Sequence, residues 1–472
     1  MISTTNLTIE SILEGYKDKE FSITEIVSTY LDRIEKLDPQ LNSFITITKE
    51  DALTKAKALD NNLTTEQFNN FPLLGLPIAF KDMYLTKRIR TTAASKVLEN
   101  YVPAYDGTVV KKLKNAGAII LGKLNHDAWA HGGSGENSQF GPTKNPWNTE
   151  YVPGGSSSGS AVAVASGFTP LAMGTDTGGS IRQPASFTNT VGLKPTYGRV
   201  SRSGVIAMAS SLDTIGHLTR TVKDSARVLE ITAGQDNLDA TLHKELPESY
   251  TKNLEKGIKG VKIGIPKEFI GTGTQPEVKE VFEKAVKEFE SLGAEIVDVS
   301  LPHTEYGIAV YYILQTAEVS SNLARYDGVR YGENRTFFGD EAKRRIMLGT
   351  YVLSAGYYDA YYKKAMQVRT LVKKDYDEAF QKVDALIAPV SPTLPWKLGE
   401  KVNDPLAMYL QDALTVTINI AGIPGLSVPA GFSGGLPVGI QILGPHFSEE
   451  KLFQIGHSFE QQTNYWKETP KL

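Results

Sequence analysis

Residues 153–182 read PGGSSSGSAVAVASGFTPLAMGTDTGGSIR. Two loops rich in glycine and serine, at 153–160 and 174–182, flank an alanine- and valine-rich run at 161–165. A flexible linker has no use for such a helix-forming run, whereas a tightly packed site needs small residues where backbones approach each other or a ligand. We therefore expect this stretch to be folded and to hold a site.

Each loop taken singly has ordinary explanations. A glycine-rich loop that opens a helix often binds phosphate, but neither loop has the Gly-x-x-x-x-Gly-Lys-Ser/Thr pattern or the dinucleotide Gly-x-Gly-x-x-Gly spacing after a strand. Neither loop forms a Gly-x-Ser-x-Gly elbow with an obvious histidine partner. An ordinary turn stays an alternative for either loop, so neither loop alone indicates a functional site. The two loops must be considered together with the rest of the chain.

The flanking sequence alternates short apolar runs with helical stripes. Apolar runs at 76–80 and 118–121 enclose a stretch at 109–116 whose apolar residues share one helical face, and the same rhythm recurs at 261–299. Further apolar strands are expected at 385–388, 426–428 and 438–443. A repeated order of strand, helix and strand predicts an α/β fold.

The first part of the chain is typical of helices. Residues 21–25, Phe-Ser-Ile-Thr-Glu, form a capping box with a candidate hydrophobic staple, and apolar residues follow at helical spacing over 26–37. Pro39 is expected to end that helix. We expect residues 1–60 to form an N-terminal helical segment packed on a core made by residues 61–472.

Composition excludes several classes of function. The chain has 472 residues, of which 41% are hydrophobic, and its net charge of −3 at pH 7 gives no global reason to bind nucleic acid or an anionic membrane. The absence of cysteine excludes thiol nucleophiles and thiolate metal sites, and the seven histidines lack metal-binding spacing. No signal sequence or bilayer-spanning stretch is apparent, so we expect a cytoplasmic protein.

Three segments taken together resemble the amidase signature family. The family pattern is a Lys-Asp pair at the end of a strand, a Gly-Gly-Ser-Ser-Gly-Gly-Ser loop and a Gly-x-Asp-x-Gly-Gly-Ser-Ile-Arg segment, which correspond here to residues 81–82, 154–160 and 174–182. One departure is Ser158, where the family usually has glycine. The resemblance implies one large domain, with its signature region at about 75–205 and a central mixed β-sheet covered by helices on both faces.

The resemblance also implies a catalytic triad without histidine. Ser180 would be the nucleophile, Ser156 the bridge and Lys81 the base. A serine hydroxyl needs a base to take its proton, and lysine can do so only when neutral, so the site must lower the reference pKa of about 10.4 by roughly 3 pH units. Backbone N–H groups are the expected oxyanion donors. These donors would be Thr177, Gly178, Gly179 and Ser180.

Longer segments narrow the resemblance to the glutamine-binding A subunits of tRNA-dependent amidotransferases. The matching segments are residues 133–138, 143–147, 194–202 and 338–362. Within that likeness, Tyr311, Arg345 and Asp412 match positions that bind glutamine. An arginine fork suits an α-carboxylate and an aspartate suits an α-ammonium, so the set would select a free amino acid. Ala128-Trp129 and His131 depart from the usual pattern beside the first loop.

The resemblance implies that the chain hydrolyses glutamine to glutamate and ammonia for a partner that amidates mischarged Glu-tRNA(Gln) or Asp-tRNA(Asn). The implied partners are a tRNA-binding kinase/transamidase subunit, which would hold ATP and Mg²⁺, and a small third subunit. No cofactor or metal is expected in this chain, its contact with tRNA would be indirect, and no membrane is involved. A free-standing amidase acting on a small neutral amide and a non-catalytic assembly subunit stay open as alternatives.

Overall fold

The computed structural model describes residues 2–244, 249–271, 273–330 and 332–472. The strands in these residues are β1 (Phe44–Ile47), β2 (Pro77–Lys81), β3 (Ile119–Leu124), β4 (Leu171–Asp176), β5 (Val191–Lys194), β6 (Thr214–Thr219), β7 (Lys262–Pro266), β8 (Glu295–Val299), β9 (Ala385–Pro389), β10 (Gly425–Ser433) and β11 (Leu436–Leu443). They form one eleven-stranded sheet in the order β1-β3-β2-β4-β6-β5-β10-β11-β9-β7-β8.

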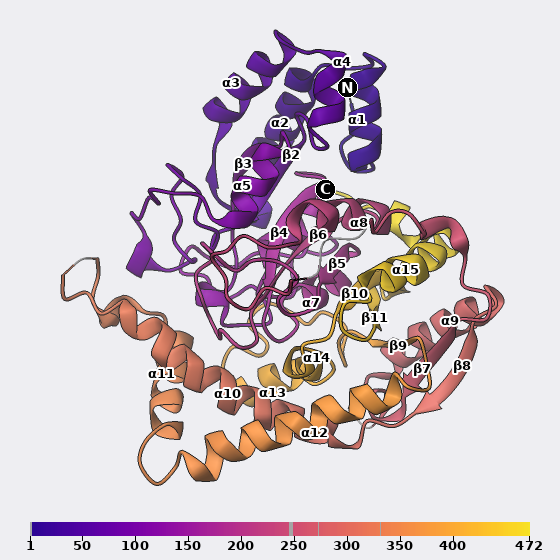
Figure 1. Cartoon of the computed structure of the whole chain (residues 1–472). Helices are drawn as coiled ribbons and strands as arrows, with labels where there is room; N and C mark the ends of the chain where they lie inside the picture. The colour runs from indigo at the N-terminus through magenta and orange to yellow at the C-terminus, as the bar shows by residue number, and fades with distance from the viewer. Residues whose placement is uncertain (1, 245–248, 272, 331) are drawn as a thin grey trace.

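Helices surround this sheet (Figure 1). Those of the described residues are α1 (Ile9–Lys17), α2 (Ile23–Leu41), α3 (Lys49–Asp60), α4 (Thr65–Asn70), α5 (Thr108–Asn115), α6 (Ser158–Ala165), α7 (Arg182–Thr188), α8 (Val222–Thr232), α9 (Pro276–Ser291), α10 (Gly307–Asn322), α11 (Asp340–Val352), α12 (Lys364–Ala379), α13 (Pro405–Tyr409), α14 (Val416–Ala421) and α15 (Glu449–Thr463).

The residues of β10 show that helices cover both faces. A Cβ on Gly456 of α15 would lie 2.8 Å from the Leu426 side chain, whereas a Cβ on the preceding strand residue, Gly425, would lie 3.1 Å from Arg182 of α7. Because successive residues of a strand point to opposite faces, α15 and α7 lie on opposite sides of the sheet. The predicted fold class, α/β with a central mixed sheet covered on both faces, is confirmed.

The sheet is mixed because two parallel units flank an antiparallel centre. Strand β2 pairs in parallel with β3 and β4, and β7 pairs in parallel with β8 and β9. All pairings from β4 through β6, β5, β10 and β11 to β9 are antiparallel. The two parallel pairs β2–β3 and β7–β8 are joined by α5 and α9, which confirms both predicted units of strand, helix and strand.

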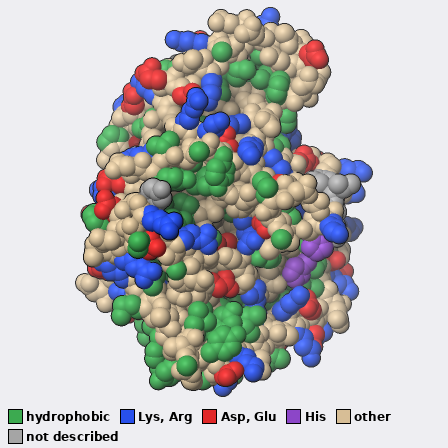
Figure 2. Space-filling model, turned by 60° about the vertical axis from the view of Figure 1, so that its left-hand side comes forward, with side chains coloured by type: hydrophobic (Ala, Val, Ile, Leu, Met, Phe, Trp, Pro, Cys, Tyr) green, Lys and Arg blue, Asp and Glu red, His purple; other side chains and the backbone are tan. Residues whose placement is uncertain are grey.

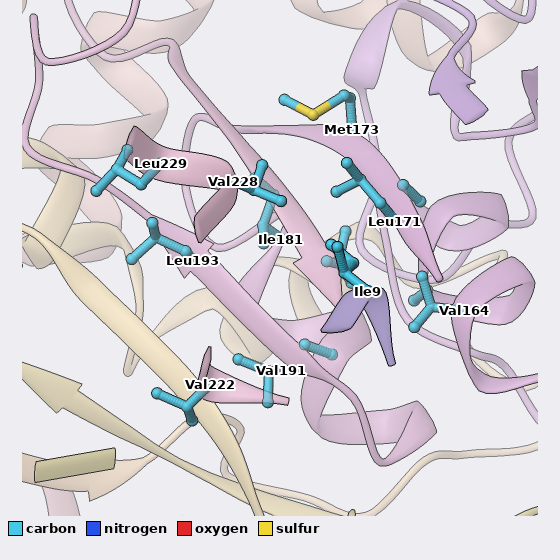
Figure 3. Packing of buried hydrophobic residues seen from close by; sticks show 14 of the residues in the cluster. Ile9, Val164, Leu171, Met173, Ile181, Val191, Leu193, Val222, Val228 and Leu229 are labelled. Carbon is cyan, nitrogen blue, oxygen red and sulfur yellow. The ribbon is translucent and has the colours of Figure 1, made fainter. Parts of the chain in front are cut away.

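The quoted stretch lies in the centre of the core. Every residue from 152 to 196 is buried. Apolar side chains of β4 and β5 pack there with those of α8 and α1, among them Leu171, Leu193, Val228 and Ile9 (Figure 3). The small residues allow close packing, since a Cβ on Gly159 would stand 2.4 Å from the Ser43 carbonyl. The stretch is therefore a packed part of the fold and not a linker.

The N-terminal segment contains one correction to the sequence analysis. The capping box between Ser22 and Glu25 is present at the start of α2. The expectation that Pro39 ends this helix is wrong, since α2 continues to Leu41. Proline removes one hydrogen-bond donor, but the turn after it still closes, because the Asn42 N–H donates to the Asp38 carbonyl at 2.7 Å and the Asp38 carboxylate accepts from the N–H groups of residues 43 and 44.

Strand β1 is an element that the sequence did not predict. It lies between α2 and α3 and pairs antiparallel with β3, at the edge of the central sheet. The described residues 2–60 thus contribute three helices and an edge strand. The boundary at residue 60 stays a prediction.

The surface carries charge of both signs. Lys and Arg side chains are interspersed with Asp and Glu over the face in Figure 2. Large exposed hydrophobic side chains occur on α11 and in the segment that joins it to α12. We call Tyr351, Tyr357, Tyr358 and Tyr361, each 40–47% exposed, the tyrosine cluster. In the part of the chain that the structure describes, no helix has both the length and the apolar character needed to cross a bilayer.

Candidate active site

Lys81 lies at the end of β2 and is buried. Because β4 is a parallel neighbour of β2, the carboxyl ends of both strands meet at one edge of the sheet. At that edge, Lys81 Nζ donates hydrogen bonds to Ser156 Oγ at 2.7 Å, Ser157 Oγ at 3.1 Å and Thr175 Oγ1 at 2.8 Å. The residues predicted as base and bridge are therefore in direct contact.

Burial governs the protonation of Lys81. Removal from water lowers the pKa of its amine to about 7, although the negative charges of Asp127, Asp176 and Asp213 act in the opposite direction. A substantial fraction of the amine is therefore neutral near pH 7. This is the form that can accept a proton.

The two serines beside Lys81 differ in what their hydroxyl groups can do. The Ser157 hydroxyl donates to the Thr175 carbonyl at 3.2 Å, so toward Lys81 it acts as an acceptor. The Ser156 hydroxyl has Lys81 as its side-chain partner. Ser156 is thus the serine suited to pass a proton to the neutral amine.

Ser180 lies against the same loop. Its carbonyl accepts a hydrogen bond from the Ser157 N–H at 3.1 Å, which joins the two glycine- and serine-rich loops. The Gly155–Ser156 peptide bond beside this contact is cis. Ser180 is 9% exposed, whereas Lys81 and Ser156 are fully buried. A nucleophile must meet its substrate while its base stays dry, so this gradient of exposure suits the predicted roles.

The loop after β4 requires glycine at two positions. A Cβ on Gly178 would stand 2.6 Å from the Tyr311 hydroxyl. Gly179 has a φ of +128°, and a Cβ there would lie 2.4 Å from Thr415 Oγ1. Its N–H donates to Asp176 Oδ1 at 2.8 Å. The Gly179 N–H, one of the predicted oxyanion donors, is therefore already hydrogen-bonded to a carboxylate. The predicted oxyanion hole then depends on the N–H groups of Thr177, Gly178 and Ser180.

Thr177, in this loop, lines a cavity. A cavity of about 390 Å³ is lined by Met83, Thr175, Thr177 and Met208, among other residues. The Thr177 hydroxyl donates to Asp213 Oδ1 at 2.8 Å, on the wall of the same cavity. Thr175, whose hydroxyl accepts a hydrogen bond from Lys81, and Thr177, at the start of the predicted oxyanion loop, thus line the same cavity.

A buried ion pair between Arg182 and Asp176 stabilises the loop that carries Ser180. Arg182 donates from Nε to Asp176 Oδ2 and from Nη2 to Asp176 Oδ1, both at 3.0 Å, and both side chains are fully buried. Asn419 and Gln441 satisfy further atoms of the pair. Burial alone would raise the pKa of Asp176, but Arg182 and these hydrogen bonds hold it well below its usual range. Asp176 therefore stays ionised and holds the loop.

The three predicted substrate-binding residues come from distant parts of the chain. Arg345 on α11 is buried, bonded to Glu341 Oε1 at 2.7 Å, with its guanidinium 5.3 Å from the centre of the Tyr312 ring. The Tyr312 hydroxyl donates to Asp412 Oδ2 at 2.7 Å. Tyr312 thus bridges the arginine and the aspartate. Both charges therefore contact the same tyrosine.

This clamp adjoins the nucleophile loop. The Thr415 hydroxyl donates to the Gly178 carbonyl at 2.6 Å, and the Thr415 N–H donates to the Asp412 carbonyl in the same turn. Tyr311 reaches Gly178 from α10, as described above. All the site residues predicted from the sequence therefore gather at one place, although their roles stay predictions.

Two residues that depart from the family pattern, Ser158 and His131, are both buried. The Ser158 hydroxyl donates to Thr143 Oγ1 at 3.2 Å, and its Cβ lies 2.6 Å from the position that a Cβ on Gly135 would take, so the absence of a side chain there makes room for the serine. His131 is buried, and neither ring nitrogen has a partner among the described residues. Burial and the nearby charge of Arg345 lower the pKa of His131 well below its usual value.

Comparison with known proteins agrees with this geometry. The sequence profile of the Amidase family matches residues 25–453. The chain belongs to the amidase signature family.

Its relatives within the family include amidotransferase subunits and an aryl acylamidase. The chain is 52% identical to the A subunit of the glutamyl-tRNA(Gln) amidotransferase from Geobacter metallireducens, over 97% of each chain. It is 43% identical to the crystal structure of the same subunit from Thermotoga maritima, with a TM-score of 0.85 and coverage of 98% and 96%. A bacterial aryl acylamidase structure is 28% identical, with a TM-score of 0.87 and 98% of each chain covered.

Sequence reasoning missed residues that complete this amidase signature site. Tyr312 contacts both charges of the clamp, whereas the family resemblance pointed to its neighbour Tyr311. Gln183 holds the Gly155 N–H through Oε1 at 2.9 Å. The sequence signal that could have identified Gln183 was its position directly after Arg182, the last residue of the family pattern. Neither contact follows from spacing, because each depends on which way a side chain turns in the folded core.

The pH dependence of kcat tests Lys81 as the base. At saturating amide, kcat is expected to fall about tenfold for each pH unit below 7 and to level off above it, because only the neutral amine accepts a proton. Asp213→Asn removes a negative charge that raises the Lys81 pKa, and because burial raises the pKa of Asp213 only to about 6, that charge is present at pH 7, so this variant should shift the midpoint to lower pH. A rate that rises on acidification, or a midpoint that moves to higher pH in the variant, contradicts the assignment.

Proposed function

We propose that the chain is the glutaminase subunit of a tRNA-dependent amidotransferase. It would hydrolyse glutamine to glutamate and ammonia, and the ammonia would amidate mischarged Glu-tRNA(Gln) or Asp-tRNA(Asn) on a partner subunit. The observation that carries the proposal is the clamp: a buried arginine, Arg345, and a half-buried aspartate, Asp412, joined through Tyr312 beside the nucleophile loop. The relatives that carry the name of this subunit support it.

The proposed chemistry proceeds in two halves. Ser180 Oγ attacks the side-chain carbonyl of glutamine while its proton passes through Ser156 to the neutral Lys81, and backbone N–H groups stabilise the tetrahedral oxyanion. The carbon–nitrogen bond then breaks, the proton returns from Lys81 through Ser156 to the leaving nitrogen, and ammonia departs. A water molecule attacks the remaining ester by the same relay, which releases glutamate and restores Ser180.

The clamp supplies selectivity for a free amino acid. Arg345 keeps its charge, because Glu341 and the surrounding tyrosines raise its pKa against the effect of burial. Burial raises the pKa of Asp412 to about 7, so a ligand ammonium beside it would favour the charged form. A fixed cation and a titrating carboxyl match the α-carboxylate and α-ammonium of glutamine.

Partners complete the proposed reaction. A tRNA-binding kinase/transamidase subunit would hold ATP and Mg²⁺ and activate the mischarged tRNA, and a small third subunit would join the assembly in the cytoplasm. The exposed tyrosine cluster between α11 and α12 supports a role in assembly, because contiguous exposed apolar side chains often mark protein interfaces. In this arrangement tRNA need not touch the present chain.

A free-standing amidase is the second candidate, favoured by the structural similarity to the aryl acylamidase. It would act on a small neutral amide without partners. Such an enzyme gains nothing from Arg345, whose buried charge would face an uncharged substrate. Substrate charge therefore distinguishes the two candidates.

Ammonia release from glutamine by the native complex, isolated on a tagged copy of this chain, tests the proposed function. Wild type is expected to release ammonia, Ser180→Ala to reduce kcat by about 10⁴-fold or more, and Arg345→Met to raise KM for glutamine by at least about tenfold. Equal release by Ser180→Ala would disprove the proposed mechanism. Fast turnover of a neutral amide by the chain alone, unaffected by Arg345→Met, would favour the second candidate.

A further inference from the structure

Gln183 occupies a position between the catalytic loop and the clamp. It is the second residue of α7 and is 2% exposed. Its Oε1 accepts a hydrogen bond from the Gly155 N–H at 2.9 Å, immediately before Ser156. An N–H donor can face only the oxygen of a carboxamide, so this contact fixes the orientation of the whole group.

The other end of the same carboxamide has no partner among the residues that the structure describes. Gln183 Nε2 is buried and makes no hydrogen bond to any residue in the described ranges. A buried amide donor left without a partner costs free energy, so its retention calls for a function. The direction in which Nε2 points therefore decides what it can bind.

Gly133 shows where that direction leads. A Cβ on Gly133 would have as its nearest atoms Gln183 Nε2 at 3.6 Å, Asp412 Oδ1 at 3.7 Å and Gln183 Oε1 at 3.9 Å. A single point thus lies within ordinary contact distance of a free donor and of a carboxylate oxygen. Two glycines of the same loop differ, because a Cβ would be 2.4 Å from Asp127 at Gly132 and 2.6 Å from Ser158 at Gly135.

The charges around this point match the two ends of an amino acid. Asp412 offers an acceptor for an α-ammonium, and Gln183 Nε2 offers a donor for an oxygen of the adjoining α-carboxylate. The Arg345 guanidinium lies 5.3 Å from the centre of the Tyr312 ring, and a cavity of about 320 Å³ is lined by both Arg345 and Ser134, the residue that follows Gly133. An α-carboxylate has two oxygens, so it can accept from both the guanidinium and the carboxamide.

We propose that Gln183 is a further substrate-binding residue, whose Nε2 donates to the α-carboxylate of glutamine while its Oε1 holds the Gly155 N–H. The inference rests on the proposed function and adds to it a direct link between substrate recognition and the loop that carries Ser156. Gly133 belongs to the same subsite, because the absence of a side chain there leaves room for the α-carbon substituents.

Gln183→Glu is the first variant that tests the proposal. It preserves the size of the side chain and an oxygen for Gly155, but it replaces the donor with a negative charge that repels the carboxylate. KM for glutamine should rise by about 10- to 100-fold with kcat little changed, the scale of a lost hydrogen bond to a charged group. KM for 4-aminobutanamide, which is glutamine without the carboxylate, should not rise.

Gly133→Ala is an independent variant with a matched control. Apart from its chain neighbours, the nearest atom that the added methyl group meets in the described residues is Gln183 Nε2 at 3.6 Å, so the fold should tolerate it, yet it occupies the space of the ligand. KM for glutamine should rise and thermal stability should stay unchanged. Gly271→Ala makes the same substitution where the nearest atom is the Glu268 carbonyl at 3.5 Å, and it should leave both quantities unchanged.

The outcomes separate this inference from the function on which it rests. If wild type hydrolyses glutamine but Gln183→Glu raises KM for both substrates equally, or lowers kcat for both, Gln183 only positions Gly155 and the inference is wrong. If Gly133→Ala binds glutamine as wild type does, the subsite is wrong as well. If wild type does not hydrolyse glutamine, the proposed function fails and the inference fails with it.

Discussion

Replacing Lys81 with methionine is expected to reduce kcat by about 10⁴-fold or more, the scale observed when a member of a catalytic triad is removed. Methionine has a similar length and no ionisable group, so it fills the buried space at the end of β2 but cannot accept a proton. Lys81 contacts three hydroxyl groups, and the proposed proton relay to Ser180 runs through that of Ser156. Steady-state ammonia release at saturating glutamine measures the loss.

The same variant should bind glutamine almost normally, because the clamp residues Arg345 and Asp412 are unchanged. Calorimetric titration of the inactive protein with glutamine checks this, and a thermal unfolding curve checks that the fold is intact. If the variant folds and keeps kcat within about tenfold of wild type, Lys81 is not the base, since general-base catalysis is worth at least about 10²-fold.

Replacing Arg182 with methionine is expected to lower the free energy of unfolding by about 3–5 kcal/mol, the cost of leaving a buried charge without its partner. Asp176 would lose two hydrogen bonds from the guanidinium, and the acceptors on Asn419 and Gln441 would lose theirs. The loop that carries Ser180 begins at this aspartate, so activity should fall with stability. Urea denaturation followed by circular dichroism measures the change.

A double variant and a surface variant provide the controls. Arg182→Met combined with Asp176→Asn removes both charges, and it should lose less stability than the two single changes added together. Lys284→Met breaks the exposed pair with Glu280, which should not change stability measurably. A single Arg182→Met variant as stable as wild type would show that Asp176 does not depend on this ion pair.

The sequence predicted β2, β3 and the strands from β7 to β11, but it missed the edge strand β1 and three adjacent strands, β4, β6 and β5. Strands β2 and β3 have continuous apolar runs bounded by helices, and these runs identified them. Strands β4 and β6 read LAMGTD and TIGHLT, and both are buried on both faces among small and polar residues. Burial on both faces removes the alternation of apolar and polar residues, so no periodicity was available to detect them.

The candidate site divides in a similar way. Ser156 and Ser180 lie in segments rich in glycine and serine, and Lys81 follows an apolar run in a Lys-Asp pair, so the three segments together could be matched to a family. The clamp residues Arg345 and Asp412 have no local signal, and only resemblance over the whole chain pointed to them. Their encounter depends on the packing of α10 and α11 against the turn before α14, which no short stretch of sequence encodes.

The order of the strands has a consequence for the synthesis of the chain on the ribosome. Strand β5 ends at residue 194 and β9 at residue 389, yet their neighbours β10 and β11 begin only at residues 425 and 436. A nascent chain therefore carries two unpaired sheet edges until its last hairpin emerges, and such edges invite aggregation. Ribosomes that stall shortly before residue 425 would thus yield two open half-sheets in need of a chaperone.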